Sequence, residues 1–322
     1  MVVTGPAAGG EVAAAPVRLR LGTRKSALAL AQSGMVARAL EALHPGLAVD
    51  LVPVVTSGDV TLGDLAKLGG KGLFTLELES GLLDGSLDLA VHSLKDLPVT
   101  LPEGLVVAAH PERADPRDVL VSEIAADLDG LPAGALLLTG ALRRQAQIRL
   151  RRPDLRVEAI RGNVDTRLRK WRENGAAGVI LAAAGIARLG LGGLPAHPLD
   201  PEVVIPAPGQ GTLALEVRAG SRAEALCRAL DHPPTARAAA AERQVVAAFG
   251  GSCVLPLAAW AREESGAGGA PRLRLLALLA TPDGSLAARA EVVAADPRSA
   301  AEACVAALKE NGADEVLARL GA

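Results

Sequence analysis

Tyrosine is absent from this 322-residue chain, and only two phenylalanines and two tryptophans are present. Half of the residues are nevertheless apolar, so the buried core must be built mainly from alanine, leucine and valine. A chain of this length can form two or three domains, each with its own core. Because aromatic rings are so scarce, an aromatic residue in a loop points to a special role.

Cysteine is almost as rare, with only Cys227, Cys253 and Cys304, and none of the three lies in a C-x-x-C pair. Such a set favours neither a disulfide framework nor a zinc site, and we expect no bound metal. Cys227 and Cys304 lie in helical patterns, where a small buried hydrophobic residue is the usual interpretation. Cys253 follows the sequence GGS in a predicted loop, where a thiolate could act as a nucleophile or covalent anchor. Local context alone leaves a structural loop cysteine equally open.

Long apolar runs are also missing, and no stretch of about 18 apolar residues predicts a membrane span. The first sixteen residues, MVVTGPAAGGEVAAAP, lack the basic start and continuous apolar run of a signal peptide, so residues 1–15 are expected to form a disordered tail. The net charge of −2 gives no overall attraction to nucleic acid. We therefore expect a cytoplasmic protein that binds neither nucleic acid nor a membrane.

Strand and helix patterns alternate along the chain, which favours an α/β architecture. The first set of expected elements comprises strand 17–22, helix 26–43 with Ser26 as its N-cap, strand 48–55, a short helix near 74–84 and strand 87–91. After 114–118 the pattern restarts with strand 135–139, helix 141–151, strand 155–160, helix 164–173, strand 178–182 and helix 184–189. Segments 21–30 and 138–147 match each other, which indicates two similar lobes. From about residue 234, a helical run, strand 272–280 and a closing helix 298–320 predict a smaller α+β domain.

Several arginines fall where a predicted strand gives way to a helix. Helix N-termini attract anions, and a guanidinium there adds a bidentate grip on a carboxylate or phosphate. Each such contact contributes about 1.5–3 kcal/mol. In a chain with 28 arginines and six lysines, a solvated surface role stays open for any single one. Together they predict a ligand with many negative charges; they are Arg24, Arg143, Arg144, Arg161 and Arg167.

The stretch 90–98, AVHSLKDLP, crowds polar residues at the end of a strand, where α/β proteins place ligands. A serine–histidine–aspartate triad is disfavoured, because these residues are too close in sequence and no G-x-S-x-G motif exists. Asp96 is better suited to face a developing cation, with Lys95 nearby. A local turn cap is the alternative role for Asp96.

The glycine-rich segment 65–76, LAKLGGKGLFTL, lacks the spacing of a phosphate-binding loop. We interpret residues 57–72 as a mobile lid, with an ordinary flexible loop as the alternative. The lid and its flank would present Asp59, Lys67, Lys71 and Phe74. RGNVDTRL at 161–168 is likewise no nucleotide-binding fingerprint.

Taken together, these motifs resemble the hydroxymethylbilane synthase (porphobilinogen deaminase) family over nearly the whole chain. The matching segments are TRKSALAL (23–30), HPGLAVDLVPVVTSGD (44–59), LAKLGGKGLFTLELE (65–79), AVHSLKDLP (90–98), LRRQAQ (142–147), RGNVDTRL (161–168), AAAGIARLG (182–190), PAPGQG (206–211) and GGSCVLP (250–256).

The resemblance implies specific roles for residues in these motifs. Cys253 would carry a dipyrromethane cofactor through a thioether, and Asp96 would be the catalytic carboxylate, assisted by Lys95. Other residues would line the same cleft and bind the acetate and propionate groups of cofactor and growing chain: Arg24, Ser26, Ser93, Arg143, Arg144, Arg161, Arg167, Arg188 and Gln210.

The resemblance also implies a fold and a reaction. Two lobes like those of periplasmic binding proteins would span residues 16–112 with 207–230 and residues 113–206, and the C-terminal domain residues 234–322. The family condenses four porphobilinogen molecules, releases ammonia at each step and finally releases hydroxymethylbilane with water, in tetrapyrrole and haem biosynthesis. A monomer is expected. The chain departs from the usual family pattern at Ala27, Ser57, Gly140 and Ala141, which puts contact detail in question.

A non-enzymatic two-lobed protein that binds anions or other solutes would share the fold and the arginines at helix ends. An exported receptor, however, needs a signal peptide and has no use for the loop thiol of Cys253. A nucleotide-dependent transferase is disfavoured because no phosphate-binding motif is present. The synthase is therefore the expected function.

Overall fold

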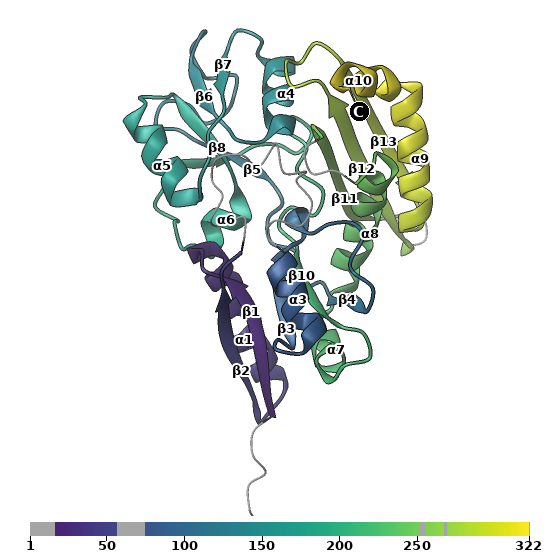
Figure 1. The fold of residues 1–322 in the computed structure, drawn as a ribbon. Helices are drawn as coiled ribbons and strands as arrows, with labels where there is room; N and C mark the ends of the chain where they lie inside the picture. The colour runs from purple at the N-terminus through teal and green to yellow at the C-terminus, as the bar shows by residue number, and fades with distance from the viewer. Residues whose placement is uncertain (1–16, 57–74, 252–254, 267–268, 322) are drawn as a thin grey trace, which may run out of the picture.

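Three β-sheets organise the protein, which the computed structural model describes over residues 17–56, 75–251, 255–266 and 269–321 (Figure 1). Two sheets have five strands and one has three. Each five-stranded sheet and its helices form one lobe, and the three-stranded sheet belongs to a smaller C-terminal domain. The expected α/β class with two lobes and a smaller third domain is confirmed.

The sheet of the first lobe has the order β2-β1-β3-β10-β4. Its strands are β1 (Val17–Arg24), β2 (Leu47–Val54), β3 (Leu89–Ser93), β4 (Leu105–Ala109) and β10 (Leu213–Arg218). Strand β1 is parallel to β2 and β3, whereas β10 is antiparallel to both β3 and β4. The helical segments are α1 (Ala27–Leu43), α3 (Leu76–Asp84), α7 (Arg222–Cys227) and the short 3-10 turns η1 (Leu94–Asp96) and η2 (Arg228–Leu230).

Successive side chains of β3 point to opposite faces of the sheet, which explains how helices cover both faces. Leu89 and Val91 pack in a cluster with Leu40 of α1, whereas Ala90 packs in a second cluster with Leu82 of α3. Helix α1 begins as expected, because the Ser26 Oγ accepts a hydrogen bond from the backbone N–H of Ala29 at 3.3 Å. The N-cap expectation for Ser26 is confirmed.

The second lobe repeats this plan with the strand order β7-β6-β8-β5-β9. Its strands are β5 (Asp118–Val121), β6 (Leu136–Leu138), β7 (Arg156–Glu158), β8 (Gly178–Ala182) and β9 (Ala196–Pro198). Its helices are α4 (Leu142–Arg151), α5 (Val164–Glu173) and α6 (Ala183–Arg188). Strand β6 is parallel to β7 and β8, and β5 is antiparallel to β8 and β9. Strand β6 with α4 therefore corresponds to β1 with α1, which confirms the expected equivalence of 138–147 and 21–30.

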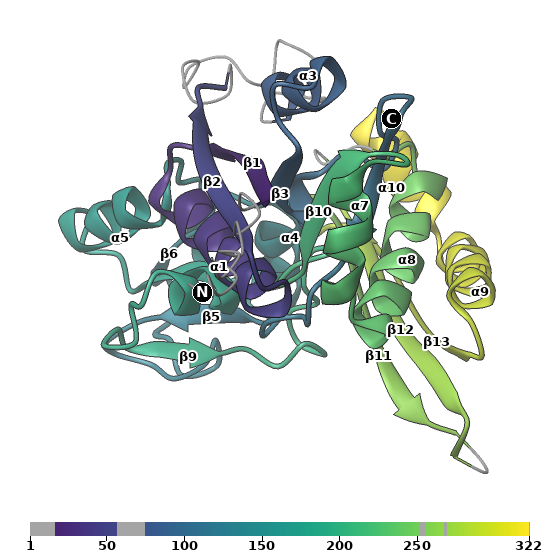
Figure 2. The same cartoon turned by 90° about the horizontal axis from the view of Figure 1, so that it is seen from below.

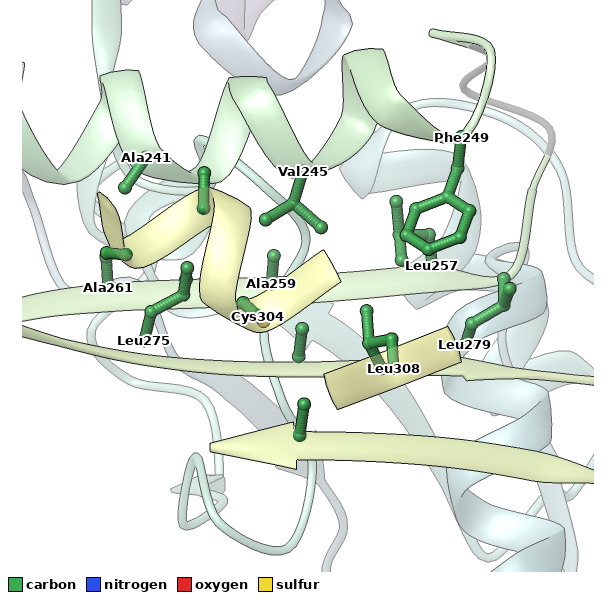
Figure 3. Packing of buried hydrophobic residues seen from close by; sticks show 14 of the residues in the cluster. Ala241, Val245, Phe249, Leu257, Ala259, Ala261, Leu275, Leu279, Cys304 and Leu308 are labelled. Atoms are coloured by element: carbon green, nitrogen blue, oxygen red, sulfur yellow. The ribbon is translucent and has the colours of Figure 1, made fainter. Parts of the chain in front are cut away.

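The C-terminal domain consists of an antiparallel sheet with helices on one face. Its elements are β11 (Leu257–Ser265), β12 (Pro271–Ala280), β13 (Ala287–Ala294), α8 (Pro233–Ala248), α9 (Pro297–Glu310) and α10 (Ala313–Leu320). Figure 3 shows Val245 and Phe249 of α8 above the sheet, with Leu308 of α9 in the same core. The opposite face meets the second lobe, where Leu276 packs with Ala146 of α4. The expected single closing helix over 298–320 is wrong, because the chain turns between α9 and α10.

Two segments, residues 110–117 and 199–212, cross between the lobes and are called the crossing segments below. Cys227 and Cys304 are buried, and burial raises the pKa of each thiol to about 12, as expected for structural cysteines. None of the helices in the described ranges is long and apolar enough to cross a lipid bilayer.

The packing of the C-terminal core predicts that two substitutions in its sheet change the free energy of unfolding by very different amounts. Leu275 is fully buried, so Leu275→Ala should lower the free energy of unfolding by about 2–5 kcal/mol through lost contacts and a cavity. Val293 on the neighbouring strand is 43% exposed, so Val293→Ala should change it by less than about 0.5 kcal/mol. Urea unfolding followed by fluorescence measures both, and equal effects would contradict this packing.

Candidate active site at the junction of the two lobes

Asp96 lies at the end of η1, the 3-10 turn that directly follows β3. Leu94, which begins the turn, and Leu97, which follows it, are buried, whereas Asp96 is exposed. The apolar–polar sequence of this turn thus anchors it and leaves the carboxylate accessible. The Leu94 N–H also donates to Thr212 O at 3.0 Å, which ties the turn to the second crossing segment.

A buried carboxylate, Asp118 at the start of β5, lies opposite in the second lobe and holds two arginines. Arg143 Nη1 donates to Asp118 Oδ2 at 2.6 Å, and Arg143 Nη2 donates to Oδ1 at 3.1 Å. Arg144 Nη2 donates to Oδ1 at 2.7 Å. Both arginines lie in the first turn of α4, whose N-cap Ala141 offers no side-chain hydrogen bond, and they are only 5% and 4% exposed.

Gln210 on the second crossing segment connects this cluster to the first lobe. Its Nε2 donates to Asp118 Oδ1 and to Pro116 O, both at 2.7 Å. Its Oε1 accepts from Arg143 Nη2 at 3.1 Å and from Lys95 Nζ at 3.4 Å. A hydrogen-bonded path therefore runs from Lys95, beside Asp96, to the arginines of the second lobe.

The position of Gln210 depends on its neighbour Gly211. Gly211 has a φ of 86°, and a Cβ there would overlap the carbonyl oxygen of Ala114 on the other crossing segment. Only glycine combines this left-handed conformation with so close an approach. The two crossing segments can therefore touch, and Gln210 reaches Asp118.

Electrostatics couple the two lobes at this junction. Burial raises the pKa of Asp118, but the charges of Arg143 and Arg144 outweigh burial and hold the pKa well below its usual value. Burial lowers the pKa of Lys95 to about 8, although the negative charge of Asp96 opposes the decrease. Lys95 can therefore gain or lose a proton near neutral pH, next to an exposed carboxylate.

Two further arginines of the second lobe lie close to this junction. Arg167 Nε donates to Gly162 O at 2.8 Å; burial and Arg144 lower the pKa of Arg167, whereas Asp96 of the other lobe raises it. Arg188 Nη2 donates to Gly211 O at 2.6 Å, and burial lowers its pKa to about 10. Within the described residues, the buried Nε atoms of Arg144 and Arg188 have no hydrogen-bond partner. Both are donors that an anion could use.

The other expected site residues fall into two groups. Ser26 caps α1, the Ser93 Oγ accepts from Gln32 Nε2 at 2.9 Å, Arg24 ends β1, and Arg161 is exposed before α5. Their contacts with a ligand stay predictions. Several expected residues lie outside the described residues, namely Cys253 and the lid residues Asp59, Lys67, Lys71 and Phe74.

The departure at Gly140 has a structural counterpart. A Cβ at this position would overlap the backbone oxygen of Ile160 and lie 3.5 Å from Arg167 Nη2. A serine would therefore need a backbone shift, and the absence of a side chain lets the turn before α4 approach the Arg167 guanidinium.

The sequence-based reasoning missed Asp118 and a second buried ion pair. Asp118 precedes three buried apolar residues in β5, and a charged residue leading so apolar a strand was the available signal. Arg113 on the first crossing segment binds Glu242 of α8 through its two terminal guanidinium nitrogens, with Nη1 donating at 2.6 Å and Nη2 at 3.2 Å. Glu242 also accepts from the N–H groups of Gly209 and Ala261, which joins a crossing segment to the C-terminal domain.

A cavity of about 400 Å³ lies elsewhere, between β2 and α3 of the first lobe. It contains none of the expected site residues. Within the described ranges, no group of three or more His, Cys, Asp or Glu side chains could hold a metal ion.

Comparison with known proteins identifies the family. Residues 19–225 match the family model "Porphobilinogen deaminase, dipyromethane cofactor binding domain", and residues 236–311 match "Porphobilinogen deaminase, C-terminal domain". The chain belongs to the porphobilinogen deaminase family. The porphobilinogen deaminase of Ralstonia nicotianae is 47% identical over 319 residues, covering 96% of this chain and 94% of the relative. That of Syntrophotalea carbinolica is 47% identical over 306 residues, covering 94% and 96%.

Solved structures give weaker likenesses. An ancestral cationic amino acid solute binding protein is 16% identical, with a TM-score of 0.42, and covers 66% of this chain and 87% of its own. The methionine binding protein MetQ is 11% identical, with a TM-score of 0.41, and covers 66% and 89%. With scores this low, neither bears on function. In the family match, the cofactor-binding model spans Asp96, Asp118 and the arginines around them, and the C-terminal model spans Cys253.

The buried cluster predicts a strong and pH-dependent effect of Asp118→Asn. Losing the carboxylate charge leaves two buried guanidinium groups uncompensated, which should lower the free energy of unfolding by about 3–5 kcal/mol at neutral pH. The pKa of Asp118 is lower in the folded state than in the unfolded state. Its ionised carboxylate therefore contributes fully to the free energy of unfolding above the unfolded pKa, and this contribution is lost progressively as the pH falls below about 4. The difference between wild type and Asp118→Asn should therefore shrink in acid.

Asp129 provides the matched control, since its ion pair with Arg151 is exposed. Asp129→Asn should change the free energy of unfolding by less than about 1 kcal/mol. Urea unfolding at pH 7 and pH 3 measures both variants. If Asp118→Asn behaved like Asp129→Asn at pH 7, the cluster would not hold the junction together.

Proposed function

We propose that this protein is a transferase of tetrapyrrole synthesis that acts as a porphobilinogen deaminase, or hydroxymethylbilane synthase. It condenses four porphobilinogen molecules onto a dipyrromethane primer attached to Cys253, releases ammonia at each step and frees hydroxymethylbilane by hydrolysis. Family membership across both matched regions carries the proposal. The exposed Asp96 beside a basic cluster supports it.

The charge balance of the junction suits a ligand with several carboxylates. Among the described residues that these contacts join, cationic side chains outnumber carboxylates: Asp96 and Asp118 face Lys95, Arg143, Arg144, Arg167 and Arg188. Each porphobilinogen carries two carboxylates, so each addition supplies two negative charges. The buried Nε donors of Arg144 and Arg188 are suited to receive them.

The described residues next to Cys253 fit a primer held beside Asp96. A Cβ at Gly251, two residues before Cys253, would lie 2.8 Å from Val99 Cγ2, and Val99 follows Asp96 by three residues. Gly251 thus lies against the segment that follows Asp96, and Cys253 comes two residues later in the sequence. When bound, the primer supplies the pyrrole end on which the chain grows.

Asp96 and Lys95 are assigned the catalytic roles. Loss of ammonia from porphobilinogen leaves a cation, which a fixed carboxylate at Asp96 stabilises. The same carboxylate can accept a proton when the new bond is complete. Lys95, with its pKa lowered to about 8, can return a proton at neutral pH. Ser26, Ser93, Gln210, Arg24 and Arg161 are assigned to binding.

We further propose the domain division inferred from the sequence: residues 16–112 with 207–230, residues 113–206 and residues 234–322. The protein would act as a cytoplasmic monomer without nucleic acid or a membrane surface, in keeping with its net charge of −2.

Intact-protein mass spectrometry tests the primer directly. The mass should exceed that of the sequence by two linked pyrrole units, and peptide mapping should locate them at Cys253. Peptides with the buried Cys227 and Cys304 serve as internal controls and should be unmodified. An unmodified protein without porphobilinogen turnover would instead support a two-lobed anion-binding protein.

Removal of the Asp96 carboxylate should abolish most turnover with little effect on folding. In Asp96→Ala, kcat should fall at least about 100-fold, because charge stabilisation of this kind is worth about 10²–10³-fold. Asp50→Ala is the control, because Asp50 forms an exposed ion pair with Arg18 at the edge of the first sheet. Porphobilinogen consumption by the purified proteins measures both, and near-normal turnover of Asp96→Ala would remove Asp96 from the mechanism.

A further inference from the structure

Helix α8 of the C-terminal domain packs along the segment that carries Asp96. Figure 2 shows α8 between β10 of the first lobe and the helices of its own domain. Ala239 of α8 forms one buried cluster with Leu94 and Leu97, the residues that anchor the Asp96 turn. The catalytic turn therefore rests on a helix from another domain.

One turn further along α8, Arg243 binds the chain directly after this turn. Its Nη1 donates to Leu97 O at 3.1 Å and its Nη2 donates to Pro98 O at 2.7 Å. Two donors of one planar guanidinium thus hold two successive carbonyl groups, which fixes both position and orientation. A single ammonium group could not reproduce this geometry.

A buried carboxylate supports Arg243 from the first lobe. Burial lowers the pKa of Arg243, and the charge of Glu216 on β10 opposes that decrease. Glu216 is fully buried, and its Oε2 lies 2.9 Å from His92 Nε2 on β3. Arg243 therefore combines two hydrogen bonds to the backbone of the Asp96 segment with a favourable electrostatic interaction with Glu216.

The chain just after α8 makes a third contact with the same segment. Gly251 has a φ of 67°, and a Cβ there would lie 2.8 Å from Val99 Cγ2. A larger residue would be strained by its conformation and would press against Val99. Contacts from Ala239 to Gly251 thus follow residues 94–99 in order, and Cys253 comes two residues later in the sequence.

We propose that Arg243 is a positioning residue that fixes the spacing between the Asp96 carboxylate and the chain leading to Cys253. This inference rests on the proposed function, because it matters only if Cys253 anchors the growing chain. Among the described residues, the hydrogen bonds of the Arg243 side chain go to the carbonyl groups of Leu97 and Pro98 and not to the Asp96 carboxylate. Arg243 thus holds the segment directly after Asp96 against the helix that precedes Cys253 in the sequence. Elongation needs this spacing to be kept, since a misplacement of about 1 Å can lower a rate about 100-fold.

Arg237 on the same helix offers a matched control. Its Nη2 donates to Ala295 O at 2.9 Å and its Nε lies 2.8 Å from Glu263, so both partners belong to its own domain. Arg237→Ala removes an arginine and a backbone hydrogen bond from α8 without touching the Asp96 segment. A difference in kcat between Arg243→Ala and Arg237→Ala therefore reports on the contact between α8 and the Asp96 segment.

The experiment compares wild type, Arg243→Ala, Arg243→Lys and Arg237→Ala as purified holoenzymes. Intact mass gives the fraction carrying the primer, and steady-state kinetics with porphobilinogen give kcat and KM for that fraction. In Arg243→Ala, kcat should fall about 10- to 100-fold with little change in KM, and partly extended covalent complexes should accumulate. Arg243→Lys should recover part of kcat, and Arg237→Ala should match wild type.

Gly251 gives a second measurement that does not remove Arg243. Gly251→Ala should also lower kcat, and adding Val99→Ala should restore part of it, because the second change removes the methyl group that the new Cβ meets. Failure of Val99→Ala to improve Gly251→Ala would contradict the proposed spacing.

The remaining outcomes separate this inference from the proposed function. If the primer-loaded fraction of Arg243→Ala turned over as fast as Arg237→Ala, or if only KM changed, the positioning role would be overturned. If wild type itself carried no primer and consumed no porphobilinogen, the proposed function would fail first, and the positioning role with it.

Discussion

Asp118 places one negative charge in a buried region that Arg143, Arg144 and Lys95 share. A buried guanidinium group without a counter-charge is costly, and neighbouring cations repel one another. Asp118 offsets part of that cost while binding side chains from α4 and from a crossing segment. Because it cannot neutralise every cation around it, the junction keeps a positive field that favours a polyanionic ligand. The same charge thus stabilises the fold while leaving an excess of cations among the described residues of the junction.

The two lobes use one fold in different ways at equivalent positions. In the first lobe, α1 begins with the capping hydroxyl of Ser26, which satisfies a backbone donor of the helix. In the second lobe, α4 begins at Ala141 without a side-chain cap and places two arginines in its first turn. The lobe that contributes most of the cations thus has positive charge where the first lobe has a side-chain cap. The shared strand order shows that both kinds of helix start are compatible with the same fold.

Local pattern was sufficient to predict much of the fold. Helix 164–173 and strand 178–182 were predicted with the bounds that the structure shows. The helix places its apolar residues on one face and has Asn163 as a cap, and the strand is a short continuous apolar run. The closing helix was predicted too long, since its apolar spacing continues across Asn311 and Gly312. The sequence also did not reveal that β10 pairs with β3 and β4, because no local signal encodes a partner so far away along the chain.

For the site, sequence position predicted which residues approach the junction but not what they bind. Arg143 and Arg144 were recognised as arginines at a helix start. Their bonds to Asp118 depend on a residue 25 or more positions away, and on a burial that only the assembled sheet produces. The hydrogen bonds from Arg243 to the carbonyl groups of Leu97 and Pro98 are even harder to predict, since they join segments about 145 residues apart.

The place of β10 in the first sheet has a consequence for how the chain matures on the ribosome. This strand separates β3 from β4, yet it is synthesised only after every strand of the second lobe. The second lobe can therefore close while the first still has a gap in its sheet, with two strand edges unpaired. Such edges invite association with other chains, so the nascent protein passes through an aggregation-prone interval that ends when residues 213–218 emerge.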